Sequence, residues 1–373
     1  MILLLHNRYR TLGGEERVVD ELARLIPQQL GEEVTRFESS SADISAAQAA
    51  VGLVRGGLNP DALAAEIRRT GARVVHAHNL LPAYGWRALA AARAAGARTV
   101  LTMHQYRLVC AAGTCLDSAG EDCTRCHGRD TRPGVRLNCR GGSRAEASLY
   151  AASLARWSAR TVEEADVLTV PSAFTLERLR ELGAPIDGRS VEVLPNPVFE
   201  AAEKADPPSG SYAICSARLA HDKGVDLAIE ACALAGRPLV ITGHGPDREK
   251  LERLAATLGA DVRFAGRVSE QELARLRAGA ALAVVPSRFA ETFGLSAAEA
   301  MAAALPVVGF NVGALCDLLA DGQLADPGSV DQLASLIALY WGDRELGLGN
   351  AGKISVIASP EVVARRLASL YGQ

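Results

Sequence analysis

Two glutamates in the second half of the chain are spaced so that both could act on one hydroxylated ligand. Glu291 and Glu299 are separated by seven residues in the stretch SRFAETFGLSAAEA, residues 287–300. The pair Phe293-Gly294 lies between them and precedes an alanine-rich segment, a pattern typical of a turn followed by a helix. Acids in this arrangement could hydrolyse a glycosidic bond, hold the hydroxyl groups of a ligand, or lie on a helix surface without function.

The hydrolytic alternative fits this spacing poorly. Glycosidase carboxylates flank one bond at about 5–9.5 Å from each other, whereas here one acid is predicted before a helix and the other inside it. An ionised carboxylate that accepts from vicinal ribose hydroxyls makes charge-assisted bonds of roughly 1.5–3 kcal/mol each. We therefore expect Glu291 and Glu299 to hold a hydroxylated ligand.

Several glycine turns and two cations indicate a phosphate site. Gly13-Gly14, Gly243 and Gly294 follow predicted strands and precede helical stretches, where backbone N–H groups favour an anion. Arg218 and Lys223, in the segment SARLAHDKG (216–224), could neutralise a leaving diphosphate. No stretch matches the P-loop or a complete G-x-G-x-x-G, so these two nucleotide motifs are disfavoured.

The elements that would position these residues are βαβ units. Short apolar runs alternate with amphipathic stretches, which is typical of parallel sheets covered by helices. Strands are expected at 2–6, 74–78, 99–103 and 167–171, and then at 212–216, 239–242, 262–266, 282–286 and 306–310. The proline-rich segment 194–211 is the best linker between the two groups. DVLTVPSAF (166–174) also resembles ALAVVPSRF (281–289), which favours two doubly wound domains of similar build.

The composition agrees with a globular protein of two domains. The chain has 373 residues, of which 49% are hydrophobic and 22% charged, enough for more than one core. A formal net charge of -3 gives no general attraction to nucleic acid, and no apolar run approaches the ~20 residues that span a bilayer. The apolar start MILLL is too short for a signal peptide. We expect a cytoplasmic protein without nucleic-acid partners, and leave peripheral membrane contact and the oligomeric state open.

Five of the eight cysteines fall between residues 110 and 139. The spacing Cys115-x7-Cys123-x2-Cys126-x12-Cys139 suits a tetrahedral, structural zinc site, with Cys110 or His127 as substitute ligands. A disulfide and free thiols are the alternatives. The same segment is rich in arginine and could either attract a phosphorylated or acidic acceptor or form a solvated basic loop. These arginines are Arg125, Arg129, Arg132, Arg136, Arg140 and Arg144.

Nearly the whole chain resembles the retaining GT-B glycosyltransferases of the "glycosyl transferases group 1" set, a family 4-like group that uses nucleotide sugars. The motifs are VVHAHN (74–79), TMHQ (102–105), SARLAHDKG, TGHGP (242–246), AGRVS (265–269) and, above all, RFAETFGLSAAEAMAAALPVV (288–308). The resemblance implies an α/β fold in which two Rossmann-like domains face a central cleft. Residues 1–195, with a cysteine-rich insertion at 110–142, would bind the acceptor. Residues 196–355 would bind the nucleotide sugar, and a helix within 356–373 would pack back on the first domain.

By position, the resemblance also implies roles for single residues. Glu291 would hold hydroxyls of the donor sugar, Glu299 the ribose, and Arg218 with Lys223 would clamp the diphosphate. His104 would lie beside the donor sugar. The other positions implied for the donor are Gly13, Gly14, Gly243, Arg267 and Val268, together with the backbone near Phe293, Gly294 and Leu295.

The implied activity is transfer of a sugar, with retention, from a nucleotide-diphosphate donor to a hydroxyl of a glycan, a lipid-linked or a natural-product acceptor. A UDP-sugar is favoured and a GDP-sugar is the alternative donor. The chain contains no Asp-x-Asp motif, so we expect no catalytic metal. Ala304 and Cys316-Asp317 depart from the family pattern and put the shape of the donor loop in doubt. A nucleotide-sugar epimerase or a phosphorylase of the same architecture, and a non-catalytic sugar-nucleotide-binding protein, are the alternatives.

Overall fold

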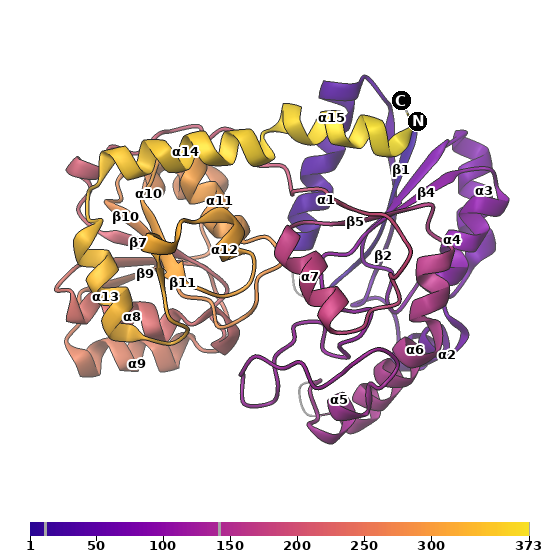
Figure 1. Ribbon diagram of the computed structural model, residues 1–373, viewed down its shortest axis with the longest axis horizontal. Coiled ribbons are helices and arrows are strands. Elements are labelled where there is room, and N and C mark those ends of the chain that lie inside the picture. The colour runs from indigo at the N-terminus through magenta and orange to yellow at the C-terminus, as the bar shows by residue number, and fades with distance from the viewer. Residues whose placement is uncertain (11–12, 141–142, 373) are drawn as a thin grey trace. The chain divides into compact units, whose positions relative to one another are not determined.

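The computed structural model describes residues 1–10, 13–140 and 143–372 (Figure 1). The chain divides into two compact α/β units. The first comprises Met1–Ala119, Cys123–Pro197 and Pro360–Gln373, and the second comprises Gly120–Asp122 and Val198–Ser359. The last two residues of the expected insertion, 141 and 142, and residue 373 of the expected C-terminal helix lie outside the described residues.

The first unit is built on a six-stranded parallel sheet with the order β2-β1-β3-β4-β5-β6. Its strands are β1 (Ile2–Arg8), β2 (Val34–Ser40), β3 (Val74–Ala77), β4 (Arg98–Thr102), β5 (Val167–Val170) and β6 (Val191–Val193). The four apolar runs that predicted strands here form β1, β3, β4 and β5. The sequence did not predict β2 and β6, because these edge strands are only half-buried and lack a continuous apolar run.

Helices cover both faces of this sheet, as in a doubly wound domain. They are α1 (Gly14–Leu25), α2 (Ala46–Arg55), α3 (Pro60–Thr70), α4 (Gly85–Ala94), α5 (Arg132–Arg136), α6 (Arg144–Glu163), α7 (Ala173–Glu181), α15 (Pro360–Tyr371) and the π-helical turn η1 (Ile26–Leu30). Figure 1 shows α1 and α15 on one side of the sheet and α3 and α4 on the other. The strand order reverses between β1 and β3, so the loops that leave these two strands flank the position where such sheets bind ligands.

Buried hydrogen bonds join the C-terminal helix to the first unit. His76 on β3 bonds to the hydroxyl of Tyr371 through Nδ1 (2.8 Å) and to Thr102 through Nε2 (2.7 Å), and Thr102 bonds to Thr169 (2.7 Å). Arg98 Nε donates to the carbonyl of Leu370 at 2.8 Å. Helix α15 is therefore fixed by a polar chain that crosses β3, β4 and β5. Burial lowers the pKa of His76 to about 3, so the chain contains a neutral imidazole.

The second unit has another six-stranded parallel sheet, with the order β12-β11-β10-β7-β8-β9. Its strands are β7 (Ala213–Ser216), β8 (Leu239–Thr242), β9 (Val262–Gly266), β10 (Leu282–Val285), β11 (Val307–Phe310) and β12 (Leu324–Ala325). All five strands predicted in this half are present, and the two-residue β12 was not predicted. The strand order reverses between β7 and β10, which places the second ligand-binding position at the carboxyl ends of these strands.

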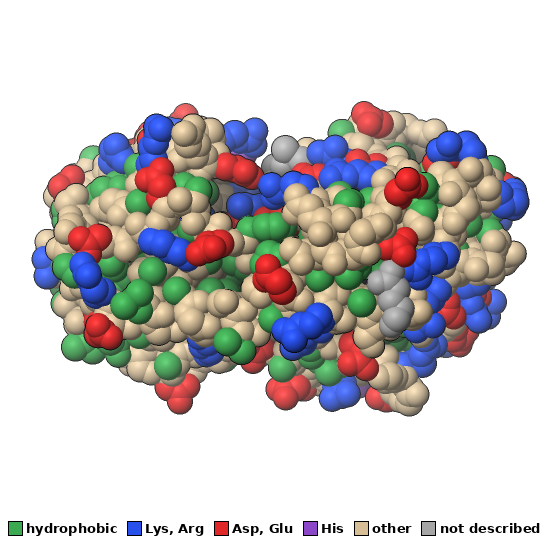
Figure 2. All heavy atoms as spheres, turned by 90° about the horizontal axis from the view of Figure 1, so that it is seen from above, with side chains coloured by type: hydrophobic (Ala, Val, Ile, Leu, Met, Phe, Trp, Pro, Cys, Tyr) green, Lys and Arg blue, Asp and Glu red, His purple; other side chains and the backbone are tan. Residues whose placement is uncertain are grey.

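The helices of the second unit are α8 (Val225–Leu234), α9 (Arg248–Leu258), α10 (Glu270–Ala278), α11 (Leu295–Ala302), α12 (Leu315–Leu318), α13 (Val330–Leu339) and α14 (Arg344–Ala358). Across the described residues, no helix combines the length and the apolar character needed to span a membrane. On the face shown in Figure 2, Lys and Arg side chains are interspersed with Asp and Glu, which agrees with the small net charge.

Three buried histidines should make the protein sensitive to mild acid. Burial lowers the pKa of His76 and His104 to about 3 and that of His78 well below its usual range. Because these pKa values are lower in the folded state, the unfolded chain binds more protons below pH 6.5. Stability that is complete above this pH is therefore lost as the pH falls, by up to about 1.4 kcal/mol per pH unit for each histidine.

The measurement is urea unfolding between about pH 7 and pH 5, above the range in which most carboxylates titrate. His76→Gln should give a shallower decline with pH than the parent protein. An equal slope in the parent and in His76→Gln would contradict the assignment.

Candidate active site

The carboxyl ends of β7 and β10 bring together the first predicted glutamate and the predicted lysine. Lys223 Nζ donates to Glu291 Oε1 at 2.6 Å, and Ser287 Oγ donates to the same oxygen at 2.8 Å. Lys223 also lies 5.1 Å from the centre of the Phe289 ring. The group expected to hold the donor sugar and the group expected to hold the diphosphate therefore form one part-buried ion pair.

Two glycines allow the backbone to approach closely around this pair. Gly224 has φ 63°, and a Cβ there would lie 1.9 Å from the carbonyl oxygen of Pro286. Gly313 has φ 64°, and its Cβ would lie 2.3 Å from the backbone nitrogen of Glu291. Side chains larger than hydrogen would push these loops apart, so the glycines fix the position of Lys223 and Glu291.

Arginines near the same strand ends are paired with acids of the chain itself. Arg218 Nη2 donates to both carboxylate oxygens of Asp222, at 2.8 and 2.9 Å, and its side chain is 46% exposed. Arg288 forks onto Asp226 at 2.7 and 2.9 Å. The sequence analysis predicted a role for Arg218 but none for Arg288. Arg288 lies in the stretch RFAE, where only the glutamate, Glu291, was given a role.

The second predicted glutamate has an arginine partner that the sequence did not suggest. Glu299 on α11 forms an ion pair with Arg277 on α10, and the two side chains are only 13% and 11% exposed. Arg277 lies in the segment ELARLRAG, and nothing in this stretch of sequence distinguishes it from an arginine on the exposed side of a helix. The pairing depends on where the tertiary structure places α10 relative to α11.

The remaining predicted donor positions lie at the carboxyl edge of the same sheet. Gly294 has φ 84° and caps the N-terminus of α11, so Phe293, Gly294 and Leu295 lie where helix N–H groups point outward. Gly243 has φ 125°, and a Cβ there would meet the carbonyl of Ala217 at 1.9 Å. Beyond β9, Arg267 Nη2 lies 3.0 Å from His244 Nε2, and Val268 packs against the core.

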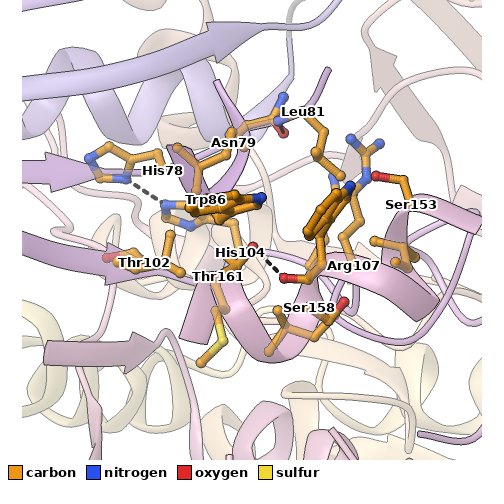
Figure 3. A pocket seen from close by; sticks show the side chains of 18 of the residues that line it. His78, Asn79, Leu81, Trp86, Thr102, His104, Arg107, Ser153, Ser158 and Thr161 are labelled. Atoms are coloured by element: carbon orange, nitrogen blue, oxygen red, sulfur yellow. Dashed lines mark hydrogen bonds between the residues drawn. The ribbon is translucent and has the colours of Figure 1, made fainter. Parts of the chain in front are cut away.

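The first unit contains a pocket next to its own strand ends (Figure 3). His78 follows β3, His104 follows β4, Trp86 comes from α4, and Trp157 and Ser158 come from α6. His78 Nδ1 and His104 Nε2 are hydrogen-bonded at 2.9 Å. The structure thus places the predicted His104 in a pocket together with His78. His78 belongs to the motif VVHAHN, but the sequence analysis assigned it no role.

The predicted glycine loop of the first unit is bound by the protein's own carboxylate. Glu16 accepts from the backbone N–H of Tyr9 and of Gly13, both at 2.8 Å. Burial opposes the charge on Glu16, but the nearby His6 ring, 3.6 Å away, and the hydrogen bonds from the Tyr9 and Gly13 N–H groups outweigh it and lower its pKa to about 2. The N–H of Gly13, expected to meet a phosphate, is therefore occupied by Glu16, and Gly14 begins α1.

Comparison with known families agrees with this arrangement. Residues 12–200 match the family model described as Glycosyltransferase Family 4, and residues 199–347 match Glycosyl transferases group 1. The chain belongs to glycosyltransferase family 4. The family predicted from the motifs is therefore confirmed.

Solved structures show the fold of this family 4 chain. Sucrose-phosphate synthase from Thermosynechococcus elongatus is similar with a TM-score of 0.72 and 18% identity, covering 99% of this chain and 98% of that one. Anabaena HepE in complex with UDP and glucose is similar with a TM-score of 0.64 and 17% identity, over 99% and 98% of the two chains. The predicted GT-B fold with two Rossmann-like domains is confirmed.

Curated relatives differ in their named substrates. A GDP-mannose-dependent monoacylated alpha-(1-6)-phosphatidylinositol monomannoside mannosyltransferase of Corynebacterium glutamicum is 29% identical over 238 residues, 56% of this chain and 62% of that protein. A 2-deoxystreptamine glucosyltransferase of Streptomyces kanamyceticus is 32% identical over 206 residues, 49% of this chain and 52% of that protein. The matched region thus spans about half to three fifths of these two relatives.

The structure does not support the zinc prediction in this family 4 chain. Five cysteines line one small cavity, namely Cys110, Cys115, Cys123, Cys126 and Cys139. Among the described residues, however, no three or more His, Cys, Asp or Glu side chains are placed to hold a metal. The thiols bond to other partners: Gly113 N–H donates to Cys110 Sγ at 3.3 Å, and Cys126 Sγ points to the Thr131 carbonyl at 3.9 Å.

Thiols rather than disulfides occupy this cavity. Hydrogen bonding from Cys115 lowers the pKa of Cys110 to about 6. Two arginines of the same segment bond to nearby acids: Arg132 to Asp130 at 2.7 Å, and Arg140 to Glu146. The guanidinium of Arg140 also lies 3.6 Å from the centre of the Tyr150 ring.

The buried pair of Arg277 and Glu299 gives a prediction about stability. Removing the arginine takes away the counter-charge of the buried Glu299 carboxylate, and breaking such a pair costs about 3–5 kcal/mol. Arg277→Met should therefore lower the free energy of unfolding by this amount in urea titrations. Arg275→Met, on the exposed side of the same helix, is the control and should change it by no more than about 0.5 kcal/mol.

A double variant tests the cause of that loss. Glu299→Gln in the Arg277→Met background removes the stranded charge and should recover part of the lost stability. If Arg277→Met lowers the free energy of unfolding no more than Arg275→Met does, the ion pair does not stabilise the unit.

Proposed function

We propose that this chain transfers a sugar, with retention of anomeric configuration, from a nucleotide-diphosphate sugar to an acceptor hydroxyl. The observation that carries the proposal is the meeting of Glu291 and Lys223 at the β7–β10 switch point, beside the N-terminus of α11. A carboxylate for sugar hydroxyls, a cation for phosphate and a helix N-terminus are what such a donor requires. A UDP-sugar is the first choice of donor and a GDP-sugar the second.

The two domains take separate roles in this proposal. Residues 1–195 bind the acceptor, residues 196–355 bind the donor, and the reaction takes place in the cytoplasm. The relatives support a sugar-nucleotide donor, since one is named as GDP-mannose-dependent and one solved structure contains UDP. They name different acceptors, a phosphatidylinositol mannoside in one case and 2-deoxystreptamine in the other.

The mechanism we favour is displacement on one face of the sugar. The bond from the anomeric carbon to the diphosphate oxygen breaks, the bond to the acceptor oxygen forms on the same face, and the acceptor's proton passes to the departing phosphate. Glu291 suits a hydrogen-bonding role better than that of a nucleophile, because one of its oxygens already accepts from Lys223 and Ser287.

Transfer without a divalent metal is part of this proposal. Arg218 and Lys223 would balance the negative charge of the leaving diphosphate, together with the N–H groups at the start of α11. Both cations are paired with carboxylates in the structure, so donor binding would have to exchange those partners for phosphate oxygens.

The proposed cation clamp predicts a loss of nucleotide affinity. Replacing Lys223 or Arg218 by Ala should weaken binding of the nucleoside diphosphate by roughly 1.5–3 kcal/mol, since each removes a charge-assisted contact. Calorimetry with UDP and GDP measures the effect, and Lys250→Ala, an exposed lysine of α9, is the control. Unchanged affinity in both variants would remove these side chains from the site.

The two glutamates should separate nucleotide binding from transfer. Glu299→Gln should weaken binding of free UDP or GDP, because it loses the charged acceptor for the ribose hydroxyls. Glu291→Gln should leave that binding unchanged and lower the rate of sugar transfer or donor hydrolysis. The reverse pattern would contradict the assignment of the two acids.

Turnover distinguishes the alternatives to this function. A non-catalytic sugar-nucleotide-binding protein would bind UDP- or GDP-sugars saturably and release no nucleoside diphosphate. A nucleotide-sugar epimerase would convert the donor into another sugar or release a free sugar without an acceptor product.

A further inference from the structure

We propose that the pocket of the first unit around His78, Trp86 and Trp157 binds the acceptor, and that this acceptor is a neutral, ring-shaped polyol such as a saccharide residue or a cyclitol. The C–H face of the acceptor ring would lie against Trp86 and Trp157, and one hydroxyl of the acceptor would bond to His78 Nε2. The inference rests on the proposed function and adds the chemical class of the acceptor.

An aromatic and aliphatic wall lines much of this pocket. The rings of Trp86 and Trp157 have centres 5.6 Å apart at an angle of 39°, and Leu81 and Leu154 extend the apolar surface. Trp157 is held in place by its N–H, which donates to the carbonyl of Val54 at 3.2 Å. Apolar walls with a few polar groups are typical of small-molecule pockets, and the C–H face of a sugar ring matches them.

Polar atoms with unused bonding capacity lie around that wall. Within the described part of the chain, Nε2 of His78, Nε1 of Trp86 and Oγ of Ser158 are buried and lack a hydrogen-bond partner. His78 is 3% and Ser158 8% exposed. Figure 3 shows His78, Trp86 and Ser158 around the same space. Buried polar groups are normally satisfied, so these atoms indicate a ligand that supplies several hydrogen bonds.

The histidine pair suits a hydroxyl in particular. His78 Nδ1 and His104 Nε2 share one proton in their 2.9 Å hydrogen bond. Burial lowers the pKa of both rings, so both are neutral at physiological pH. Whichever ring donates, His78 Nε2 presents either a lone pair or an N–H, and a hydroxyl can bond to both because it donates and accepts.

The charges around the pocket favour a neutral ligand. Arg107 lies 4.9 Å from the centre of the Tyr9 ring, and Glu15 is hydrogen-bonded to Tyr9. A phosphate would gain one guanidinium here but would meet the carboxyl of Glu15 beside it. As far as the structure describes their surroundings, Arg107 Nε and Glu15 Oε2 have no hydrogen-bond partner, and ring hydroxyls could satisfy both.

The tryptophans themselves provide the readout. The chain has three, and Trp341→Phe removes the one in the second unit, so the fluorescence of that variant reports only Trp86 and Trp157. The probes are methyl α-D-glucopyranoside and myo-inositol, with glucose 6-phosphate and myo-inositol 1-phosphate as their charged counterparts. We expect the tryptophan fluorescence to change saturably as a neutral probe is added. The phosphorylated counterpart should bind about tenfold more weakly, which corresponds to one unfavourable polar contact.

Variants locate the binding and separate this inference from the proposed function. His78→Ala should weaken binding of the neutral probe about tenfold, the effect of one lost hydrogen bond, while UDP or GDP affinity and the control His127→Ala stay unchanged. Tighter binding of the phosphorylated probes, no saturable response to either neutral probe, or no effect of His78→Ala would overturn the inference. In each of these cases nucleotide binding by the second unit would leave the proposed function standing, whereas loss of nucleotide binding and turnover would remove the function itself.

Discussion

A charge that is taken out of water must have a partner, and this constraint arranges the strand ends of the second unit. Lys223 is held by Glu291, Arg277 by Glu299, and Arg288 by Asp226. Each pair joins segments that are separated in sequence, so the pairs also fix the loops after β7 and β10 and connect α10 to α11. The residues that would bind a donor are thus the same residues that hold their own surroundings in place.

The first unit meets the same constraint in another way. Its buried strand ends contain histidines that burial keeps neutral, so they bond to each other and to hydroxyl groups without a counter-ion. The buried carboxylate of Glu16 there is satisfied by the backbone N–H groups of Tyr9 and Gly13. The neutral histidines therefore give the first unit hydrogen-bonding groups beside its apolar wall, whereas the strand ends of the second unit are dominated by ion pairs.

How far the sequence predicts this molecule depends on whether a feature is local. Fully buried strands such as β1 and β10 have continuous apolar runs and were predicted, whereas β2 and β6 at the sheet edge alternate and were missed. The spacing of Glu291 and Glu299 predicts that both acids hold a ligand, and this role stays a prediction. Their partners depend on the tertiary structure, and nothing in the sequence distinguishes Arg277 from an exposed arginine. The cysteine spacing likewise predicted zinc, but spacing along a chain does not fix the directions in which the sulfur atoms point.

The pairing of Lys223 with Glu291 bears on the order of events in the proposed reaction. A diphosphate that takes Lys223 as its counter-ion removes one of the two donors from Glu291 Oε1 and leaves Ser287 as the other. The carboxylate then has capacity for the hydroxyls of the donor sugar, so binding of the phosphates would prepare the sugar subsite. Glu299 differs, because Arg277 is held on α10 and the pair can persist while the carboxylate accepts from ribose. One acid would thus change partners during binding and the other would not, although both belong to one short motif.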